Sequence, residues 1–408
     1  MARSLPPSRA FVFTPDELRR TDRTGQALVG GRVLSARGRR LVVADALASL
    51  DVTLAEGELV APGDIVVLSG DLAAGGLHQA RLVDRTPGAL PEPGTEFARL
   101  ATEGVGARLV ARAAILRALR AELDGAGFIE VETPLRVPSP GLDAHVDAFQ
   151  AEGGWLITSP ELHLKRLVVG GLPRVYQLAR VSRKEELGAL HEPEFTLLEW
   201  YRAFSDMDAV VQDTESLVTA AAEALHGKTR LKLRGRTIEL RSPWERVTVR
   251  DAFREHAGVA DAADLAASDE DRYFQLLVDE VEPALAARPR PVALTAFPAT
   301  QAALARRRVD DPAVAERFEV YVAGVELCNG FSELTDPVEQ RARFEAELAR
   351  RRRVGAPEHP IDERFLQALA EGMPPAAGNA LGVDRLVMLL TAAERLEQVV
   401  AFPAARGA

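Results

Sequence analysis

The sequence predicts an α+β protein, with an antiparallel sheet flanked by helices and a small N-terminal β-barrel. Three observations lead to this prediction. Five short β-branched segments lie between residues 27 and 84. A proline- and glycine-rich segment, Thr86 to Thr95, follows them. The later strands and helices do not alternate regularly, which favours an antiparallel sheet over a regular βαβ array.

Composition excludes several classes of protein. The chain has 408 residues, 47% hydrophobic and 27% charged, so collagen, coiled-coil and disordered proteins are excluded. Its single cysteine, Cys328, cannot form an intrachain disulfide, and its seven histidines show no zinc-ligand spacing. We therefore expect a reducing, cytoplasmic location. No apolar run approaches the roughly 20 residues of a membrane span, and no secretion signal is visible.

The charge balance argues against a large bound nucleic acid. Fifty basic side chains stand against 60 acidic ones, which gives a formal charge of −10. Nucleic-acid affinity depends mainly on neutralising phosphates, so neither end of the chain is predicted to be a basic platform.

Four regions follow one another along the chain. We predict an N-terminal leader over 1–24, a β-barrel domain over 25–88, a linker over 89–106 and a large domain over 107–408. The barrel strands are expected at Val29 to Leu34, Arg40 to Ala44, Leu50 to Leu54, Asp64 to Ser69 and Leu77 to Val83. Prolines and glycines make the linker difficult to bury.

The large domain opens with a long amphipathic helix. Apolar residues recur at helical spacing from Leu109 to Leu123, and Gly125 and Gly127 end the pattern. Further helices are predicted at Asp208 to Leu225, Asp271 to Leu285 and Val338 to Arg353. Strands are predicted at Phe128 to Pro134, Arg174 to Arg183, Glu194 to Phe204, Val247 to Val249, Val292 to Leu294 and Phe318 to Leu327.

The strand that starts at Glu194 carries charge where apolar residues are expected. Alternate residues of a strand share a face, so Phe195, Leu197, Glu199 and Tyr201 align. A carboxylate and a phenol beside an aromatic ring could bind an amine-bearing ligand. The alternative is that Glu199 is an exposed edge residue paired with an arginine.

Two other segments could bind phosphate and its metal ion. Gly378 to Arg385 places glycines and an arginine before an apolar helix, which suits phosphate, although an ordinary strand-to-helix turn has the same pattern. Glu326 and Glu333 are candidate Mg²⁺ ligands. Their odd separation requires a bend at Asn329–Gly330, where a simple hairpin is the alternative.

Two helix ends complete the candidate sites. Ser159 and Glu161 are predicted to lie at a helix start, with the hydroxyl as a cap. Arg350 to Arg353 form a run at a helix end, interpreted as solvated and compensating the helix dipole, with RNA contact as the alternative.

Together these segments resemble the three motifs of class II aminoacyl-tRNA synthetases, in the lysyl branch. Phe128 to Pro134 is similar to the first motif, Arg180 to Tyr201 to the second and Gly378 to Arg385 to the third. Within that branch, the ligases that lysylate elongation factor P are the closer match, on the strings Thr158 to Glu161, His191 to Arg202, Phe297 to Gln301 and Gly324 to Leu334.

The resemblance implies a role for each matching residue. Arg183 and Arg385 would be catalytic and would hold the α- and γ-phosphates of ATP, while Phe195 would stack on adenine. The implied ATP-binding residues also include Glu185, His191, Glu326, Leu327 and Gly382. The implied substrate-binding residues are Ser159, Glu161, Glu199, Tyr201, Glu333 and Ala380. Glu326 and Glu333 would bind Mg²⁺, and Ala380 replaces a usual glycine, consistent with a preference for β-lysine.

The implied chemistry agrees with the residue types. An amino-acid carboxylate is already ionised at neutral pH, so attack on the α-phosphate requires charge stabilisation and no general base. The resemblance also implies a homodimer, and its oligonucleotide-binding (OB) barrel resembles residues 27–84. That segment has no Phe, Tyr or Trp to stack on bases, which favours a role in positioning a protein acceptor or the dimer.

Three hypotheses about function follow. The first is ATP-dependent activation of lysine or β-lysine and transfer to a lysine side chain of elongation factor P. The second is transfer of lysine to tRNA. The third is a catalytically silent paralogue that acts as a binding module, motivated by Lys184 and Glu192, which replace usual asparagines of the resembling ligases.

Overall fold

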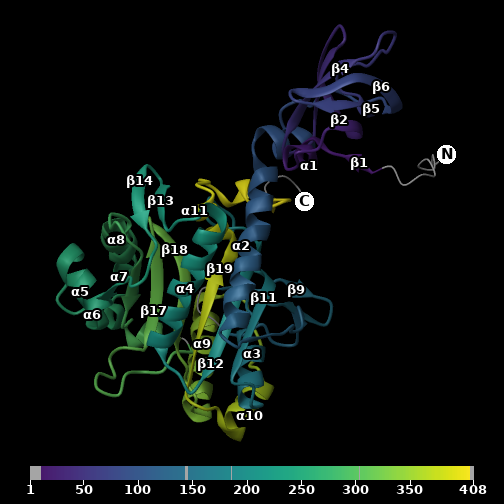
Figure 1. The fold of residues 1–408 in the computed structure, drawn as a ribbon. Coiled ribbons are helices and arrows are strands. Elements are labelled where there is room, and N and C mark those ends of the chain that lie inside the picture. Colours follow the sequence, from purple (N-terminus) through teal and green to yellow (C-terminus); the bar gives the residue numbers. More distant parts are fainter. Residues whose placement is uncertain (1–10, 143–145, 185, 303, 405–408) are drawn as a thin grey trace. The chain divides into compact units, whose positions relative to one another are not determined.

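The computed structural model describes residues 11–142, 146–184, 186–302 and 304–404. The chain divides into two compact units, Met1–Val110 and Ala111–Ala408. Each unit has hydrophobic clusters of its own. Figure 1 shows the strands of the first unit in purple and blue and the sheet of the second from teal to yellow.

The first unit contains the predicted barrel. Its strands are β2 (Gly25–Arg37), β3 (Arg40–Ala44), β4 (Ser49–Leu54), β5 (Ile65–Ala73) and β6 (Gly76–Thr86). Pairing of β2 with both β3 and β5 closes the sheet, which removes its free edges. Val29, Val33, Leu54 and Leu68 are among the residues that fill the interior. The five-stranded, OB-like barrel is therefore confirmed.

A helical turn and a further short strand precede the barrel. Helix α1 (Pro15–Arg19) starts at Thr14, whose hydroxyl accepts from the backbone of Glu17 while the Glu17 carboxylate accepts from Thr14. Strand β1 (Val12–Phe13) pairs with β2 in parallel and was not predicted.

The long helix α2 (Val105–Gly125) follows the π-helical turn η1 (Ala98–Thr102). Gly127 has a φ of 78°, the left-handed conformation that lets a chain leave a helix. The strand predicted from Phe128 to Pro134 is shorter than expected, because β7 covers Ile129–Glu130 alone. Pro134 restricts the residue before it and has no N–H to donate.

An eight-stranded sheet forms the centre of the second unit, in the order β15-β16-β17-β18-β19-β12-β11-β7. The two outer pairs, β15–β16 and β11–β7, are parallel and the inner pairs are antiparallel. This confirms the α+β prediction. The strand bounds are β11 Arg174–Ser182, β12 Glu194–Ala203, β15 Glu245–Thr248, β16 Val292–Thr295, β17 Arg317–Val322, β18 Val325–Ser332 and β19 Ala376–Gly382.

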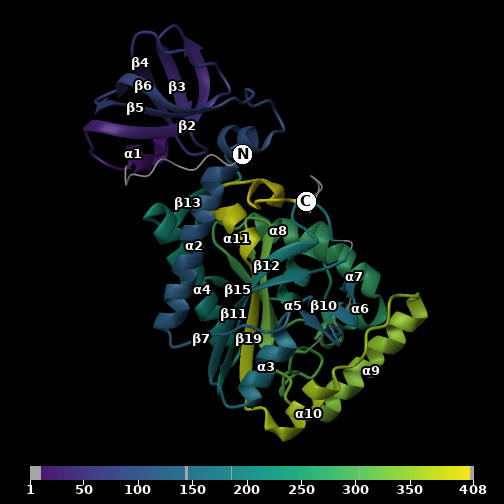
Figure 2. The ribbon, with the colours of Figure 1, turned by 90° about the vertical axis from the view of Figure 1, so that its right-hand side faces the viewer.

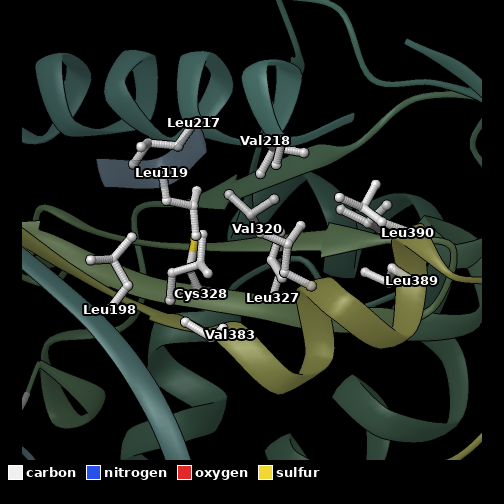
Figure 3. Packing of buried hydrophobic residues seen from close by; sticks show 14 of the residues in the cluster. Leu119, Leu198, Leu217, Val218, Val320, Leu327, Cys328, Val383, Leu389 and Leu390 are labelled. Atoms are coloured by element: carbon white, nitrogen blue, oxygen red, sulfur yellow. The ribbon is translucent and has the colours of Figure 1, made fainter. Parts of the chain in front are cut away.

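One face of this sheet packs on helices and forms the main core. Helix α4 (Met207–His226) and helix α11 (Val383–Leu390) contact the central strands. Figure 3 shows Leu217 and Val218 of α4 above Val320, Leu327 and Cys328 of the sheet. These side chains are almost fully buried, so burial of their apolar surface stabilises the sheet against the helices.

A cavity and three other helices lie on the opposite face of the sheet. These helices are α3 (Glu161–Val169), α9 (Pro337–Val354) and α10 (Glu363–Gly372), and α10 contacts both of the others. Figure 2 shows α9 and α10 following each other below the sheet. Phe344 and Phe365 of these helices pack with Tyr201 of β12, which fixes one end of the cavity wall.

Small helices form a separate cluster beside β15 and β16. They are α5 (Val249–Ala252), η2 (Phe253–Ala257), α6 (Ala262–Ser268), α7 (Glu270–Leu276), η3 (Leu277–Val281) and α8 (Glu282–Ala286). The helix predicted from Asp271 to Leu285 is therefore interrupted. A π-helical turn precedes Pro283, which can occupy the first turn of a new helix but cannot donate in a helix interior.

The remaining elements are short. They are the strands β8 (Arg136–Val137), β9 (Gln150–Ala151), β10 (Gly154–Leu156), β13 (Arg230–Leu233) and β14 (Arg236–Glu239), with the 3₁₀ turns η4 (Ala299–Gln301) and η5 (Leu396–Gln398). Among the helices that the structure describes, none has the length and apolarity needed to cross a membrane.

Candidate active site

A cavity of about 380 Å³ lies on the face of the sheet that the main core leaves free. We call it the central cavity. Its volume is within the usual range for small-ligand sites, roughly 300–1,000 Å³. Predicted site residues in its wall are Ser159, Glu161, Arg183, His191, Phe195, Glu199, Tyr201, Glu326, Leu327, Ala380, Gly382 and Arg385. Residues from distant parts of the sequence therefore meet in one place.

Strand β12 supplies the floor as the alternation of its side chains predicts. Phe195, Leu197, Glu199 and Tyr201 all line the central cavity. The intervening Leu198 and Trp200 belong to the main core. Glu199 is 1% exposed, so the alternative of an exposed edge residue is wrong.

Carboxylates dominate the end of the cavity near Tyr201, which we call the carboxylate end. Glu199 accepts from the Ser159 hydroxyl at 2.7 Å and from the Tyr201 phenol at 3.2 Å. The same Ser159 hydroxyl accepts from the backbone N–H of Glu161 at 3.0 Å, although Pro160 and not Ser159 is the N-cap residue of α3. Ser159 thus joins the start of α3 to the acidic floor of β12.

Lys165 lies at this end and was missed from the sequence. Its ammonium group is 2.5 Å from Glu161 and 2.5 Å from Glu333, and its side chain is 1% exposed. It also lies 4.9 Å from the centre of the Phe331 ring. The four-residue spacing from Glu161 on a predicted helix was the available signal.

Burial and mutual charge shift the protonation of these groups. Burial, together with the charge of Glu161, raises the pKa of Glu199 to about 8, against the hydrogen bonds from Ser159 and Tyr201. Burial opposes the charged form of Lys165, but the carboxylates of Glu161 and Glu333 raise its pKa above the ordinary value. The carboxylate end can therefore accept an added cation by releasing a proton from Glu199.

Arg385 marks the opposite, guanidinium end of the cavity. Its Nη1 donates to the Glu326 carbonyl at 2.8 Å and lies 3.1 Å from the Glu326 carboxylate. Its Nη2 is 2.9 Å from Nε2 of His191. An arginine can only donate, so His191 accepts through Nε2 and is neutral. Burial and the neighbouring Arg385 charge both lower the pKa of His191, in agreement.

Arg183 lies at the same end, over the Phe195 ring at 5.2 Å from its centre. Its Nη1 is 3.7 Å from Glu186, and its Nε donates to the Thr158 carbonyl at 3.4 Å. These contacts are long and leave the guanidinium partly exposed, so an anion could compete for it. Glu185, also predicted at the ATP site, lies outside the described residues.

The structure does not bring Glu326 and Glu333 together. Strand β18 runs without a break through Asn329–Gly330, where a bend was required. A bulge near Leu327 instead places Glu326 and Asn329 on one face, because Val320 pairs with Cys328 and Tyr321 with Glu326. Seven residues of extended chain separate the Cα atoms of Glu326 and Glu333 by roughly 20 Å, which is too far for both side chains to bind one metal ion.

Glu319 of β17 is a better candidate than Glu333 to share a metal ion with Glu326. It was not predicted from the sequence. It is 8% exposed and paired with Arg317 at 2.6 Å. Burial and the Glu326 charge raise the pKa of Glu319 to about 7, against the charge of Arg317. The turn at Ala323–Gly324 joins β17 to β18. From the sequence, this turn would have indicated that Glu319 and Glu326 lie on neighbouring strands. Among the described residues, no group of three or more His, Cys, Asp or Glu side chains could hold a metal ion.

The third motif-like segment forms strand β19 and the start of α11. Ala380 pairs with Glu199 on one side and Asn329 on the other, so its methyl group lies on the cavity floor. Gly378 leaves no room for a Cβ, which would lie 2.2 Å from the Tyr201 ring. Gly382 caps α11 and lies beside the Arg385 side chain.

Lys184 and Glu192, which replace usual asparagines of the resembling ligases, lie in the hairpin loop between β11 and β12 and have different contacts. Glu192 is 5% exposed, and its carboxylate accepts from the backbone N–H of Ala404 at 2.9 Å. It also contributes to the wall of the central cavity. The backbone N–H of Lys184 donates to the Asp147 carbonyl at 2.8 Å. Glu192 therefore joins the hairpin loop to the C-terminal segment.

Comparison with known proteins agrees with this arrangement. Residues 94–406 match the family of tRNA synthetases class II (D, K and N). The chain is 43% identical over 309 residues to an elongation factor P–(R)-β-lysine ligase of Edwardsiella ictaluri, covering 72% of this chain and 94% of that protein. It is also 43% identical over 316 residues to the ligase of the same name from Erwinia tasmaniensis, covering 72% and 94%.

A second group of relatives carries a different name. The chain is 39% identical over 318 residues to a lysine–tRNA ligase of Moorella thermoacetica, covering 73% of this chain and 65% of that protein. The matched family covers well over half of the chain and includes every residue of the central cavity. The chain therefore belongs to the class II tRNA synthetases of the D, K and N group.

Proposed function

We propose that this protein is an ATP-dependent ligase that activates lysine or β-lysine as an aminoacyl-adenylate and transfers it to a lysine side chain of elongation factor P. The observation that carries this proposal is the polarity of the central cavity. Two arginines and an aromatic ring lie at one end, and three carboxyl groups with a tyrosine lie at the other. The cavity thus suits an anionic nucleotide beside a diamino acid.

The guanidinium end would bind ATP. Arg183 would contact the α-phosphate and Arg385 the γ-phosphate, since guanidinium groups donate in pairs to phosphate oxygens. Phe195 would stack on adenine, and His191, Leu327 and Gly382 would complete the contacts. Before ATP binds, Arg385 is held by Glu326 and His191, so these contacts keep the phosphate-binding group in position.

The carboxylate end would bind the two ammonium groups of the amino acid. Glu161 and Glu199 would each accept one of them, while Tyr201 and Ser159 orient Glu199. Glu333 would act through Lys165, which it holds at 2.5 Å. The methyl group of Ala380 narrows the floor beside Glu199, which would favour one lysine isomer over the other.

A magnesium ion would be held by Glu326 together with Glu319, because both lie on the same face of the β17–β18 hairpin. When bound, the ion would neutralise charge on the phosphates. The protein's own residues bring the amino-acid carboxylate and the α-phosphate together. Arg183 would stabilise the negative charge that develops in the in-line displacement of pyrophosphate. An acceptor amine would then displace AMP.

The choice of acceptor rests on the named relatives. The ligases named for elongation factor P are matched over 94% of their length, and the lysine–tRNA ligase over 65%. To test the choice, labelled lysine or β-lysine is mixed with the enzyme and ATP, and label is measured on purified elongation factor P and on tRNA. Label on the protein supports the proposal, whereas label on tRNA alone contradicts it.

Transfer to tRNA is the second candidate function. The closed N-terminal barrel favours it, because OB-like barrels commonly bind oligonucleotides. Against it, residues 14–96 hold no Phe, Tyr or Trp side chain that could stack on a base. The third candidate, a silent binding module, predicts no pyrophosphate exchange with any amino acid or β-amino acid, whereas both ligase functions require exchange.

We also propose that the ligase works as a homodimer in the cytoplasm. Ile129 and Leu135, in and after β7, are 46% and 54% exposed, although both are large apolar residues. A partner subunit would cover them, as the resemblance of this segment to the first motif implies. Sedimentation of the wild type and of an Ile129→Asp variant tests this, with a monomeric wild type as the contradicting result.

A further inference from the structure

A second cavity, of about 480 Å³, lies beside the central cavity. Its walls come from α7, from the segment around η4, from β17 and from α9. The two cavities share Leu142, Leu304 and Arg317. Apart from Glu319, proposed above as a Mg²⁺ ligand, no wall residue that belongs to this cavity alone has a role in the proposed function, and the volume suits a small organic ligand.

Two buried polar groups in its wall have no partner within the described part of the chain. The Gln340 amide of α9 is 1% exposed, and neither its oxygen nor its nitrogen makes a hydrogen bond there. The Tyr273 phenol of α7 is fully buried and equally unpaired. Buried polar groups are nearly always hydrogen-bonded, so these groups point to a ligand or to water in the cavity.

The same cavity has an excess of positive charge. Its wall contains five arginines, Arg307, Arg317, Arg343, Arg350 and Arg353, and two carboxylates, Glu319 and Glu347. Both carboxylates are already paired, with Arg317 at 2.6 Å and with Arg350 at 2.8 Å.

Few carboxylates balance the charge of the other three arginines, Arg307, Arg343 and Arg353. Arg343 and Arg307 both approach Glu339, at 2.6 and 3.5 Å. Arg353 forms no ion pair with any residue that the structure describes. A surplus of positive charge therefore faces a small cavity, which favours an anionic ligand.

Helix α9 presents these groups on one side. Gln340, Arg343, Glu347 and Arg350 follow one another at intervals of three or four residues, so they share one face of the helix. The amide of Gln340 is buried, while Arg350 is partly exposed and Arg353 exposed. A ligand lying along this face would place a neutral hydrogen-bonding group beside the buried amide of Gln340. Its negative charge would lie beside Arg350 and Arg353, nearer the surface.

We propose that the second cavity binds a mononucleotide, with the base toward Gln340 and Tyr273 and the phosphate toward Arg350 and Arg353. A side-chain amide both donates and accepts, as the edge of a base requires. Phe297 and Phe344 in the wall offer apolar and aromatic surface to the base. Arginines bind phosphate oxygens in pairs.

The test measures binding by calorimetry on the full-length protein. The probes are GMP, CMP, UMP and inorganic phosphate, each titrated in the presence of saturating ATP and lysine. We expect at least one nucleotide to bind, and to bind more tightly than phosphate. Gln340→Leu and Arg353→Gln should each weaken it about tenfold, since each removes one hydrogen-bonding or charged contact. Arg352→Gln is the matched control, because Arg352 is the exposed neighbour that pairs with Glu358.

Several results would overturn the proposal. One is the absence of nucleotide binding to the wild type, which would mean that water alone fills the cavity. Another is equal binding of phosphate and nucleotides. A third is binding that Gln340→Leu and Arg353→Gln leave unchanged while Arg385→Ala abolishes it, which would place the nucleotide in the central cavity. Arg353 is exposed, so its variant tests the idea even if Gln340→Leu unfolds.

Discussion

Glu199 occupies a setting that favours the protonated form of its carboxyl group. Burial and the charge of Glu161 raise the pKa of Glu199 to about 8, although Ser159 and Tyr201 both donate to it. An ammonium group of the substrate would reverse this preference, because it stabilises the carboxylate. Substrate binding below that pKa should therefore release a proton.

This linkage predicts how affinity depends on pH. The KM for lysine in pyrophosphate exchange should fall as pH rises from about 6 to about 8, by up to about tenfold per pH unit. Above the pKa of Glu199 the dependence should level off, because the carboxylate is then already ionised. A Glu199→Gln variant should bind weakly and lose the dependence over this range. A dependence that persists in the variant would assign the titration to another group.

Arg385 should matter for catalysis far more than for stability. An Arg385→Ala variant should lose at least about 100-fold in the rate of pyrophosphate exchange, because a positioned charge at the phosphates would be missing. Its free energy of unfolding should fall by no more than about 1 kcal/mol, since its pair with Glu326 is partly exposed. Arg395→Ala is a suitable control, because that arginine has an exposed pair with Glu397 outside the cavity wall. Unchanged exchange would refute the phosphate role.

Some of these side chains were predictable and others were not. The alternation of β12 was sufficient to place Phe195, Glu199 and Tyr201 on one face. Lys165 was missed because a lysine one turn after Glu161 also suits an exposed helix pair. Its burial depends on Glu333, which directly follows strand β18, more than 160 residues later.

At the level of elements, the course of strand β18 explains why Glu326 and Glu333, predicted as a pair of Mg²⁺ ligands, do not lie together. A bulge is a local change in pairing, and neither Leu327 nor the two residues on each side of it is a proline or glycine that would mark it. Asn329–Gly330 is a common hairpin dipeptide, yet here Gly330 lies within the strand. A Cβ at Gly330 would lie 2.7 Å from both the Phe318 ring and the Gly378 carbonyl. Close packing of neighbouring strands, and not a turn, requires this glycine.

Strand β19 contains a glycine that the carboxylate end requires. A Gly378→Ala substitution would place a Cβ 2.2 Å from the Tyr201 ring, so Tyr201 would have to move away from Glu199. We expect the KM for lysine to rise about tenfold or more, with a smaller change in the KM for ATP. Gly125→Ala is the control, because nothing lies within 4 Å of a Cβ there. A normal KM for lysine would show that the ring adapts.

Asp384 joins three elements of the second unit. Its carboxylate accepts from the backbone N–H of Thr196 in β12 at 2.7 Å and pairs with Arg112 of α2, and its side chain is 3% exposed. Asp384→Ala should lower the free energy of unfolding by about 3 kcal/mol, because it leaves the largely buried Arg112 without an opposite charge. Urea denaturation measures this. Arg120→Ala, which removes an exposed pair with Glu130, should cost less than about 1 kcal/mol. Equal effects of the two variants would contradict the anchoring role.

At the scale of the whole molecule, the chain has two units with separate cores. The interior of the barrel is filled by residues between Leu18 and Ala80, whereas the clusters of the second unit start at Ile115. The order of β-branched strands, a proline-rich segment and a long helix predicts a barrel domain over 25–88 and a large domain over 107–408. Which residues the two units present to an acceptor is a property of folded surfaces, and local sequence patterns do not encode it.

A truncated chain can separate activation from transfer. A chain starting at residue 94, where the family match begins, retains every described residue of the central cavity. Such a chain should fold and catalyse pyrophosphate exchange within about twofold of the full-length rate, because domains with their own core commonly fold alone. Its transfer of lysine or β-lysine to elongation factor P, measured in parallel, then reports what the barrel contributes. A reduced transfer with normal exchange would assign the barrel to acceptor positioning. Loss of exchange in a folded truncated chain would contradict the independence of the catalytic unit.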